Sequence, residues 1–356
     1  MTAAHFAAKR LKLLGTGRSL PGPPVSNETL CEALESACHP RAGRRARSIA
    51  YRLGITHRHV SRDLHVPLSG TRITMQAPQL CHAALFEAMV EAGIDIASVD
   101  YLIGHTSSPH TLLPPNIAWV ADELQYTGPY LELRQACTGF ANGLQIASAM
   151  AAANALQAIA IVGSETGSPY FGMSDAFLSN EQLVNYVQMG DGAGAVVVGQ
   201  DDGSEDQIIS HIFLGQIGLG REPGFFIEGG GSSQPQCSMQ VPVFRHHVQT
   251  VREHGGELFV RGVEAMVQRG HSLGEFDWIL PHQANGHLAH LFSQYFDVPE
   301  EKIYVTADKL GNLGSAAIWV SLDLLRRSGN LKKGQRVLIL GAEASKFLFG
   351  GFVYQH

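Results

Sequence analysis

The chain has 356 residues, which is enough for one large hydrophobic core or two medium-sized ones. Apolar residues make up 45% of the sequence and charged residues 16%, as in ordinary globular proteins. The net charge of −6 argues against a nucleic-acid-binding surface, and no apolar run is long enough to predict a membrane span.

Four short apolar runs are typical of strands buried on both faces, and they form two matched pairs. The runs are 99–105, 158–165, 276–282 and 336–343. The first resembles the third at an offset of 177 residues, so that His105 corresponds to His282, and the second resembles the fourth at an offset of 178. A further strand is predicted at 130–134. Helices rich in small residues are predicted at about 138–155 and 315–327.

A strand–helix–strand pattern in each half predicts an α/β fold in which two parallel-type βαβ units share buried helices. We expect an N-terminal half, residues 1–200, and a C-terminal half, residues 201–356. No linker rich in Pro or Ser separates them, so an interlocked body is expected. The alternative is chance similarity between hydrophobic strands.

The five cysteines are odd in number and contain no Cys-x-x-Cys pair, which favours free thiols and a cytoplasmic location. The first 14 residues lack the order of a signal peptide. Among the 17 histidines, only His246-His247 and the pair His287 and His290 have ligand-like spacing, without suitable Cys or acidic partners. Neither a metal nor a cofactor is therefore expected.

Cys137 follows a predicted strand and precedes a helix of small residues. The positive end of a helix dipole lowers the pKa of a thiol, so this position predicts a reactive thiolate. The alternative is a cysteine that serves only as a small buried apolar residue.

His282 and Asn312 strengthen the catalytic interpretation of Cys137. His282 ends an apolar strand, and Asn312 lies in a glycine-bracketed turn. A cysteine can hold an acyl group, while a histidine and an asparagine can donate hydrogen bonds to an enolate formed when a β-carboxylate leaves as CO₂. Papain-type hydrolases also use Cys, His and Asn, but their local sequence around the cysteine differs.

Six stretches carry a family resemblance over nearly the whole chain. They are 14–21, 52–59, Cys137-Thr138-Gly139-Phe140, 190–195 and His282-Gln283-Ala284-Asn285, followed by Gly311-Asn312. In this order they resemble the β-ketoacyl-acyl carrier protein synthase III family of the thiolase superfamily. The resemblance implies a five-layer αβαβα thiolase-like fold built from two pseudo-repeated halves.

The same resemblance implies roles for individual residues. Cys137 would be the acyl-accepting nucleophile, with His282 and Asn312 in decarboxylation and oxyanion stabilisation. The expected substrate-binding residues are Leu113, Phe259, Asn285, Glu343 and Ser345. The backbone amide of Ser345 would complete the oxyanion hole, and Leu113 would line the acyl site of a partner subunit in a homodimer, or in a heterodimer with a related subunit. The expected substrate is an acyl-coenzyme A or acyl-carrier-protein thioester.

Several residues depart from the family pattern. The stacking Trp is missing from the stretch 45–49, and Leu183 or Val184 stands near an expected Arg. His287 replaces another Arg, and Gln294-Tyr295 replaces a pair of lysines that forms the usual docking patch for an acidic carrier protein. These losses predict a divergent member that acts in specialised metabolism.

Glu343 has two interpretations. It can act in catalysis near Cys137, or it can accept backbone hydrogen bonds at a strand end, as its repeat equivalent Glu165 suggests.

Three functions remain open at this stage. The leading hypothesis is a decarboxylative Claisen condensation of a Cys137-bound acyl group with a malonyl- or β-ketoacyl-type thioester. The second is acyl transfer from Cys137 to an oxygen, nitrogen or carbon nucleophile without decarboxylation, with His282 as general base. The third is a non-catalytic partner subunit of a condensing enzyme.

Overall fold

A computed structural model describes residues 3–64, 73–153, 157–237 and 242–356. Its main feature is a ten-stranded mixed sheet. Nine strands, whose bounds are given below, follow the order β12-β13-β14-β9-β2-β8-β7-β5-β6, and the tenth, β1 (His5–Phe6), pairs with β9. Two half-sheets meet where β2 pairs with β9 through Leu11 and Ile209.

The two half-sheets repeat the same plan. The first contains β2 (Leu11–Ser19), β5 (Tyr101–His105), β6 (Tyr130–Leu133), β7 (Ile159–Glu165) and β8 (Gly192–Gln200). The second contains β9 (Ile208–Gln216), β12 (Trp278–Pro281), β13 (Arg336–Glu343) and β14 (Leu348–Gln355), together with β1. In the first half β5 pairs with β7 in parallel and β7 pairs with β8 antiparallel, and in the second half β12 pairs with β13 in parallel and β13 pairs with β14 antiparallel. A single parallel bridge between Ile279 and Ile303 stands where the first half has β6.

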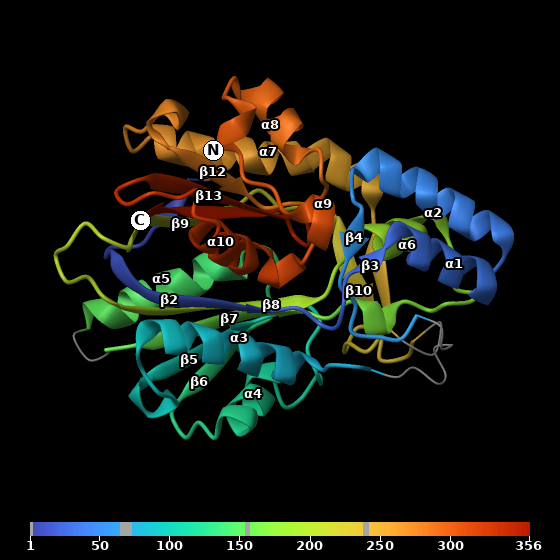
Figure 1. The fold of residues 1–356 in the computed structure, drawn as a ribbon, viewed down its shortest axis with the longest axis horizontal. Helices are drawn as coiled ribbons and strands as arrows, with labels where there is room; N and C mark the ends of the chain where they lie inside the picture. Colours follow the sequence, from blue (N-terminus) through green and yellow to red (C-terminus); the bar gives the residue numbers. More distant parts are fainter. Residues whose placement is uncertain (1–2, 65–72, 154–156, 238–241) are drawn as a thin grey trace.

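Helices separate and cover the half-sheets, which produces five layers (Figure 1). One outer layer is α3 (Ala77–Ala92) and α4 (Asn116–Leu124), drawn in teal. The central layer is α5 (Gly139–Ala152) and α10 (Ala317–Arg327), and the other outer layer is α7 (Val248–Val267) and α8 (Leu288–Phe296), drawn in orange. The predicted thiolase-like αβαβα fold is therefore confirmed.

Aromatic residues join the two half-sheets through the central layer. Phe140 on α5 packs edge-on against Trp319 on α10 and against Phe352 on β14, with both pairs of ring centroids 5.8 Å apart. All three side chains are fully buried. Burying such a side chain contributes roughly 1.5–3 kcal/mol to the stability of the fold. The cluster therefore holds α5 and α10 in place, and the candidate site residues Cys137 and Asn312 lie just before these two helices.

A smaller group of elements packs against one end of the layers. It comprises α1 (Asn27–Ala37), α2 (Pro40–Leu53), α6 (Asn180–Gln188), α9 (Ala307–Leu310), β3 (Val25–Ser26), β4 (His57–Arg58), β10 (Phe225–Glu228) and β11 (Val243–His246). Figure 1 shows α1 and α2 in blue beside the main sheet. The group has its own apolar core, and α2 and α6 form one wall of the pocket described below.

The predicted strands and helices are confirmed in type and nearly in extent. The runs 99–105, 158–165, 276–282 and 336–343 are β5, β7, β12 and β13, and the two small-residue segments contain α5 and α10. No helix among the described residues is long and apolar enough to span a bilayer. The division of the chain at residue 200 stays a prediction.

Candidate active site

Cys137 lies in the short turn between β6 and α5. The backbone amide of Gly139 donates to the carbonyl of Ala136 at 3.0 Å, and α5 begins at Gly139. A Cβ atom at Gly139 would come within 2.4 Å of His105 Nδ1 on β5, so only glycine lets the helix begin this close to the sheet. Cys137 is thus held at the helix start, where the residue is half-buried and lines the pocket described below.

The predicted lowering of the Cys137 pKa is wrong. Burial raises the pKa of this thiol well above its ordinary value, and the nearby carboxylates of Glu343 and Glu165 raise the pKa further. The helix start favours a thiolate, but desolvation and two acidic neighbours outweigh it. At neutral pH the resting group is therefore the thiol, and its proton must leave as it attacks.

Glu343 and Glu165 hold the two central helices in a crossed arrangement. Glu343, at the end of β13, accepts hydrogen bonds from the backbone amide of Thr138 at 2.9 Å and from its hydroxyl at 2.7 Å. Glu165, at the end of β7, accepts from the backbone amide of Ser315 at 3.1 Å and from its hydroxyl at 3.0 Å. Each strand-end carboxylate therefore caps the helix of the other half, as the structural interpretation of Glu343 expected.

His282 follows β12 directly and is 5% exposed. Its backbone amide donates to the carbonyl of Leu340 on β13 at 2.7 Å, which fixes the start of the loop. Burial lowers the pKa of His282 to about 4, so the imidazole is neutral at neutral pH. Its Nδ1 atom has no hydrogen-bond partner among the described residues.

Asn312 lies in a tight turn that fixes its carboxamide. Gly311 has φ +68°, and the backbone amide of Asn312 donates to the carbonyl of Gln188 at 2.7 Å. Its side-chain oxygen accepts from the amide of Gly314 at 2.9 Å. Since the oxygen is occupied, the side-chain nitrogen of Asn312 is left as a hydrogen-bond donor.

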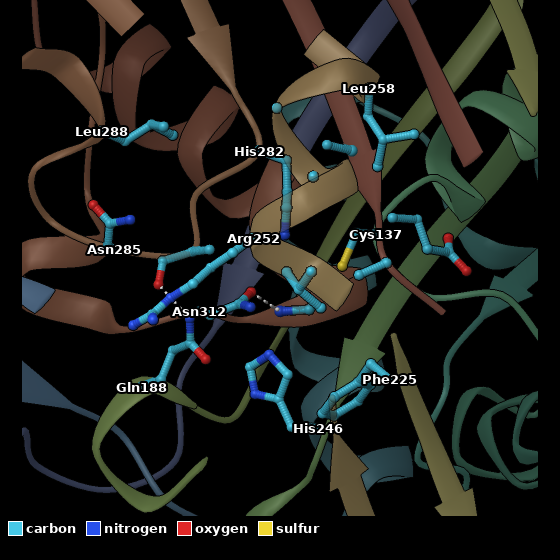
Figure 2. A pocket seen from close by; sticks show the side chains of 18 of the residues that line it. Cys137, Gln188, Phe225, His246, Arg252, Leu258, His282, Asn285, Leu288 and Asn312 are labelled. Atoms are coloured by element: carbon cyan, nitrogen blue, oxygen red, sulfur yellow. Dashed lines mark hydrogen bonds between the residues drawn. The ribbon is translucent and has the colours of Figure 1, made fainter. Parts of the chain in front are cut away.

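One cavity of about 610 Å³ unites these groups (Figure 2). Seven of the eight residues expected to form the site line it: Cys137, Phe259, His282, Asn285, Asn312, Glu343 and Ser345. The hydroxyl of Ser345 donates to Glu343. The eighth, Leu113, is 85% exposed and lies outside this cavity, and its expected contact with a partner subunit stays a prediction.

Other residues that line the cavity were not selected from the sequence. Arg52 and Arg252 are exposed at the cavity, and Gln188 and His246 lie on its wall. Arg52 belongs to the stretch 52–59, which carries part of the family resemblance and could have indicated a site residue. Burial lowers the pKa of His246 to about 4. Among the described residues, no group of His, Cys, Asp or Glu side chains is arranged to hold a metal ion.

Comparison with known proteins places this geometry in context. Residues 131–216 match the model of a family described as 3-oxoacyl-(acyl-carrier-protein) synthase III, and residues 266–353 match the model of its C-terminal region. The first segment contains Cys137, and the second contains both His282 and Asn312.

Full-length relatives agree with the family match. The chain is 27% identical over 352 residues to the β-ketoacyl-(acyl-carrier-protein) synthase III of Neisseria meningitidis serogroup B, covering 97% of this chain and 99% of that one. It is 26% identical over 348 residues to the enzyme of the same name from Rickettsia rickettsii, covering 95% and 97%. Among solved structures, AbyA1, a tetronic acid condensing enzyme, superimposes with a TM-score of 0.85 at 27% identity, covering 97% of this chain and all of that one.

Proposed function

Because the chain belongs to the β-ketoacyl-acyl carrier protein synthase III family of condensing acyltransferases, we propose that it carries out a decarboxylative Claisen condensation in specialised metabolism. The single observation that carries the proposal is that Cys137, His282 and Asn312 line one cavity. The acyl group is held on Cys137, and the second substrate is a malonyl- or β-ketoacyl-type thioester.

The first half-reaction loads the enzyme. The sulfur of Cys137 attacks the carbonyl carbon of an acyl thioester, and the carrier thiol leaves with the proton of the cysteine. Because the pKa of Cys137 is raised, proton loss accompanies the attack. The backbone amide of Ser345, which lines the cavity, is the proposed donor to the tetrahedral oxyanion.

The second half-reaction makes the carbanion. The C–C bond to the β-carboxylate breaks, CO₂ leaves, and the electron pair forms the enolate of the thioester. A neutral N–H of His282 and the side-chain nitrogen of Asn312 donate to this enolate oxygen. The enolate carbon then attacks the acyl carbonyl, forms the new C–C bond and releases the sulfur of Cys137.

Recognition of the thioester carrier is assigned to Arg52 and Arg252. Both guanidinium groups are exposed and line the cavity. Phosphate groups on coenzyme A or on a carrier-protein pantetheine suit such side chains, because arginine binds phosphate with paired hydrogen bonds. With His287 and Gln294-Tyr295 in place of the usual basic residues, these two arginines supply the positive charge near the cavity.

Specialised metabolism is favoured by the loss of that docking patch and by the likeness to a tetronic acid condensing enzyme. Intact-protein mass spectrometry after incubation with an acyl thioester tests the loading step. The wild type should gain the mass of the acyl group, and Cys137→Ala should not. An adduct of equal yield on Cys137→Ala would remove the nucleophile from the proposal.

A second candidate, acyl transfer without decarboxylation, is supported by the neutral state of His282. An imidazole with a depressed pKa and a free nitrogen can accept a proton from a hydroxyl or amine acceptor. Release of ¹⁴CO₂ from carboxyl-labelled malonyl thioester separates the two. Product formed without CO₂ would select the second candidate.

We also propose a homodimer that is completed by the loop around Leu113. Leu112 and Leu113 are 66% and 85% exposed, and β6 ends the sheet with only β5 beside it among the described strands. Exposed apolar side chains and an unpaired sheet edge each favour association between copies. Light scattering should report twice the chain mass, and Leu113→Asp should lower the acylation rate. A monomer with full acylation activity would contradict this part.

A further inference from the structure

The cavity wall formed by α6 and β11 carries two polar side chains that the proposed reaction does not use. Gln188 is the last residue of α6, and His246 is the last residue of β11. Both line the cavity that contains Cys137, where Val184 and Phe225 are apolar neighbours on the same wall. A few polar groups on a largely apolar wall are typical of atoms that orient a ligand.

The side-chain oxygen of Gln188 is fixed as a hydrogen-bond acceptor. The amide nitrogen of this side chain donates to the carbonyl of Ala284 at 2.7 Å, so the oxygen Oε1 points the other way. Gln188 is only 8% exposed, and Oε1 has no hydrogen-bond partner in the part of the chain that the structure describes. Such an acceptor is unfavourable inside a protein unless a ligand or water completes it.

His246 presents a second acceptor to the cavity. The amide nitrogen of Asn185 donates to the carbonyl of Phe244 at 3.2 Å, so the side-chain oxygen of Asn185 is the atom that faces His246 Nδ1 at 3.3 Å. Nδ1 therefore carries the hydrogen and donates it to Asn185, which leaves Nε2 with a lone pair. Nε2 has no hydrogen-bond partner among the described residues.

The two acceptors face the same part of the cavity. Figure 2 shows the side-chain oxygen of Gln188 on the side of His246, whose imidazole points into the cavity. The ring of Phe225 meets the imidazole edge-on, with centroids 5.5 Å apart, and limits its rotation. Because burial lowers the pKa of His246 to about 4, the imidazole is uncharged at neutral pH.

This wall is joined directly to the turn that holds Asn312. The backbone carbonyl of Gln188 accepts from the amide of Asn312 at 2.7 Å, and Met189 forms a parallel bridge with Asn312. The two acceptors therefore adjoin the position from which Asn312 is proposed to act on the thioester. A substrate group that they bind belongs near the reacting carbons rather than at the far end of an acyl chain.

We propose that Gln188 Oε1 and His246 Nε2, here termed the acceptor pair, bind a hydroxyl group on the acyl chain delivered to Cys137. The inference rests on the proposed function and specifies its substrate class as a hydroxyacyl thioester. Neither atom of the pair can donate, so a carbonyl or carboxylate oxygen does not suit them. The pair carries no charge, which favours a hydroxyl group over an ammonium group.

Selectivity follows from what a plain acyl chain does to this wall. An alkyl chain displaces water from the acceptor pair without replacing the hydrogen bonds, whereas a hydroxyl group donates one. Sites that are built to bind a substrate hydroxyl group discriminate strongly against the analogue that lacks it. Gln188 and His246 cannot turn their acceptors away, because the other end of each side chain is held by Ala284 or Asn185.

The test compares acyl thioesters that differ by one hydroxyl group. Loading of Cys137 is timed by intact mass spectrometry with butanoyl-, 2-hydroxybutanoyl- and 3-hydroxybutanoyl-coenzyme A at limiting concentration. The wild type should load at least one of the two hydroxyacyl groups about tenfold faster than butanoyl, or more. Equal loading of all three acyl groups by the wild type would overturn the inference.

Two variants assign that preference to the acceptor pair. His246→Phe keeps a ring beside Phe225 but removes the acceptor, and Gln188→Met removes the amide oxygen at similar length. The preference for the hydroxyacyl group should fall to about twofold or less in each, with circular dichroism reporting on the fold. The matched control is His247→Phe on the neighbouring position, which is exposed and does not line the cavity, and it should keep the wild-type preference.

The variants also distinguish the acyl chain from the carrier, because the pantetheine arm of coenzyme A has hydrogen-bond donors of its own. If the acceptor pair binds that arm, His246→Phe should slow all three loading reactions by the same factor and leave their ratios unchanged. That result would overturn the assignment to the acyl chain. A preference that survives in both His246→Phe and Gln188→Met would overturn it as well.

A direct binding measurement separates failure of the acceptor pair from failure of the proposed function. The thioethers S-butyl-, S-(2-hydroxybutyl)- and S-(3-hydroxybutyl)-coenzyme A have no acyl carbonyl and cannot load Cys137, so calorimetry reports binding alone. The wild type should bind one hydroxylated thioether about tenfold more tightly than the butyl thioether. Such a preference without acyl loading would keep the acceptor pair and refute the reaction. Loading without any preference would keep the reaction and refute the acceptor pair.

Discussion

The carboxylate of Glu343 accepts a hydrogen bond from the backbone amide of Thr138 at 2.9 Å, across a sequence separation of 205 residues. The bond joins the end of β13 to the residue that follows Cys137. It gives Glu343 two opposing effects on Cys137. Its hydrogen bonds hold the turn that presents the thiol, and its charge raises the pKa of that thiol.

Replacing the carboxylate should separate these effects. Glu343→Gln keeps an oxygen that can accept from the amide of Thr138 but removes the negative charge. The pKa of Cys137 should fall, and iodoacetamide should alkylate the thiol faster at pH 7, by up to about tenfold for each unit of pKa. Loss of charge-assisted hydrogen bonds should lower the free energy of unfolding by about 1.5–3 kcal/mol in urea.

Glu165→Gln is the matched control for that experiment. Glu165 is the weaker of the two carboxylate influences on the pKa of Cys137. Its replacement should therefore accelerate alkylation less than Glu343→Gln does. If neither variant changes the rate, the carboxylates do not govern the reactivity of the thiol.

The pH dependence of Cys137 should reflect its raised pKa. Only the thiolate reacts, and below the pKa its fraction rises tenfold for each pH unit. The alkylation rate should therefore increase about tenfold per unit from pH 6 to pH 9 without levelling off. Mass spectrometry of the alkylated protein gives the rate, with Cys137→Ser as background. A plateau in the rate below pH 8 would show that the pKa of Cys137 is lowered, as the helix start alone predicts.

His282→Ala should affect the two half-reactions unequally. The proposed role of the imidazole is to donate to the enolate oxygen, which exists only after Cys137 has been loaded. Acyl loading should remain within a few-fold of wild type, whereas CO₂ release should fall about 10²–10³-fold, as for loss of one oxyanion donor. Asn312→Ala should show the same split. Equal loss of both steps would instead make His282 the base that deprotonates Cys137.

His105 should make stability depend on pH. Its Nε2 accepts from the indole of Trp319 at 3.0 Å, and burial lowers the pKa of His105 to about 3. In the unfolded chain the pKa of this histidine is near 6.5, so the unfolded chain binds a proton that the folded protein does not bind. Stability is therefore lost as pH falls below about 6.5, at roughly 1.4 kcal/mol per unit for this group.

His105→Gln tests this contribution, because glutamine can still accept from Trp319 but does not titrate. Urea unfolding at pH 6, 5 and 4 should show a shallower fall in stability for the variant than for the wild type. His282 also makes stability depend on pH, because its pKa is lowered to about 4. Its contribution is the same in the variant and in the wild type. Parallel curves would show that His105 is protonated in the folded state.

The sequence predicted the architecture well because the strands are buried on both faces and leave continuous apolar runs. The position of Cys137 before a small-residue helix was also predictable, as was its grouping with His282 and Asn312. The pKa of Cys137 was not, because it depends on burial and on Glu343, which is 206 positions away.

The roles proposed for Arg52 and Arg252 could be argued only from the cavity, since nothing near them in the sequence connects α2 with α7.

The crossed caps have a consequence for how this chain can change. In the repeat, Thr138 and Ser315 occupy equivalent helix starts, but only the first is preceded by a cysteine. Each start depends on a carboxylate supplied by the opposite copy. If either half were deleted, exchanged or expressed alone, a helix start in the remaining half would lose the carboxylate that caps it. The two halves must therefore fold together, even though the proposed nucleophile belongs to only one of them.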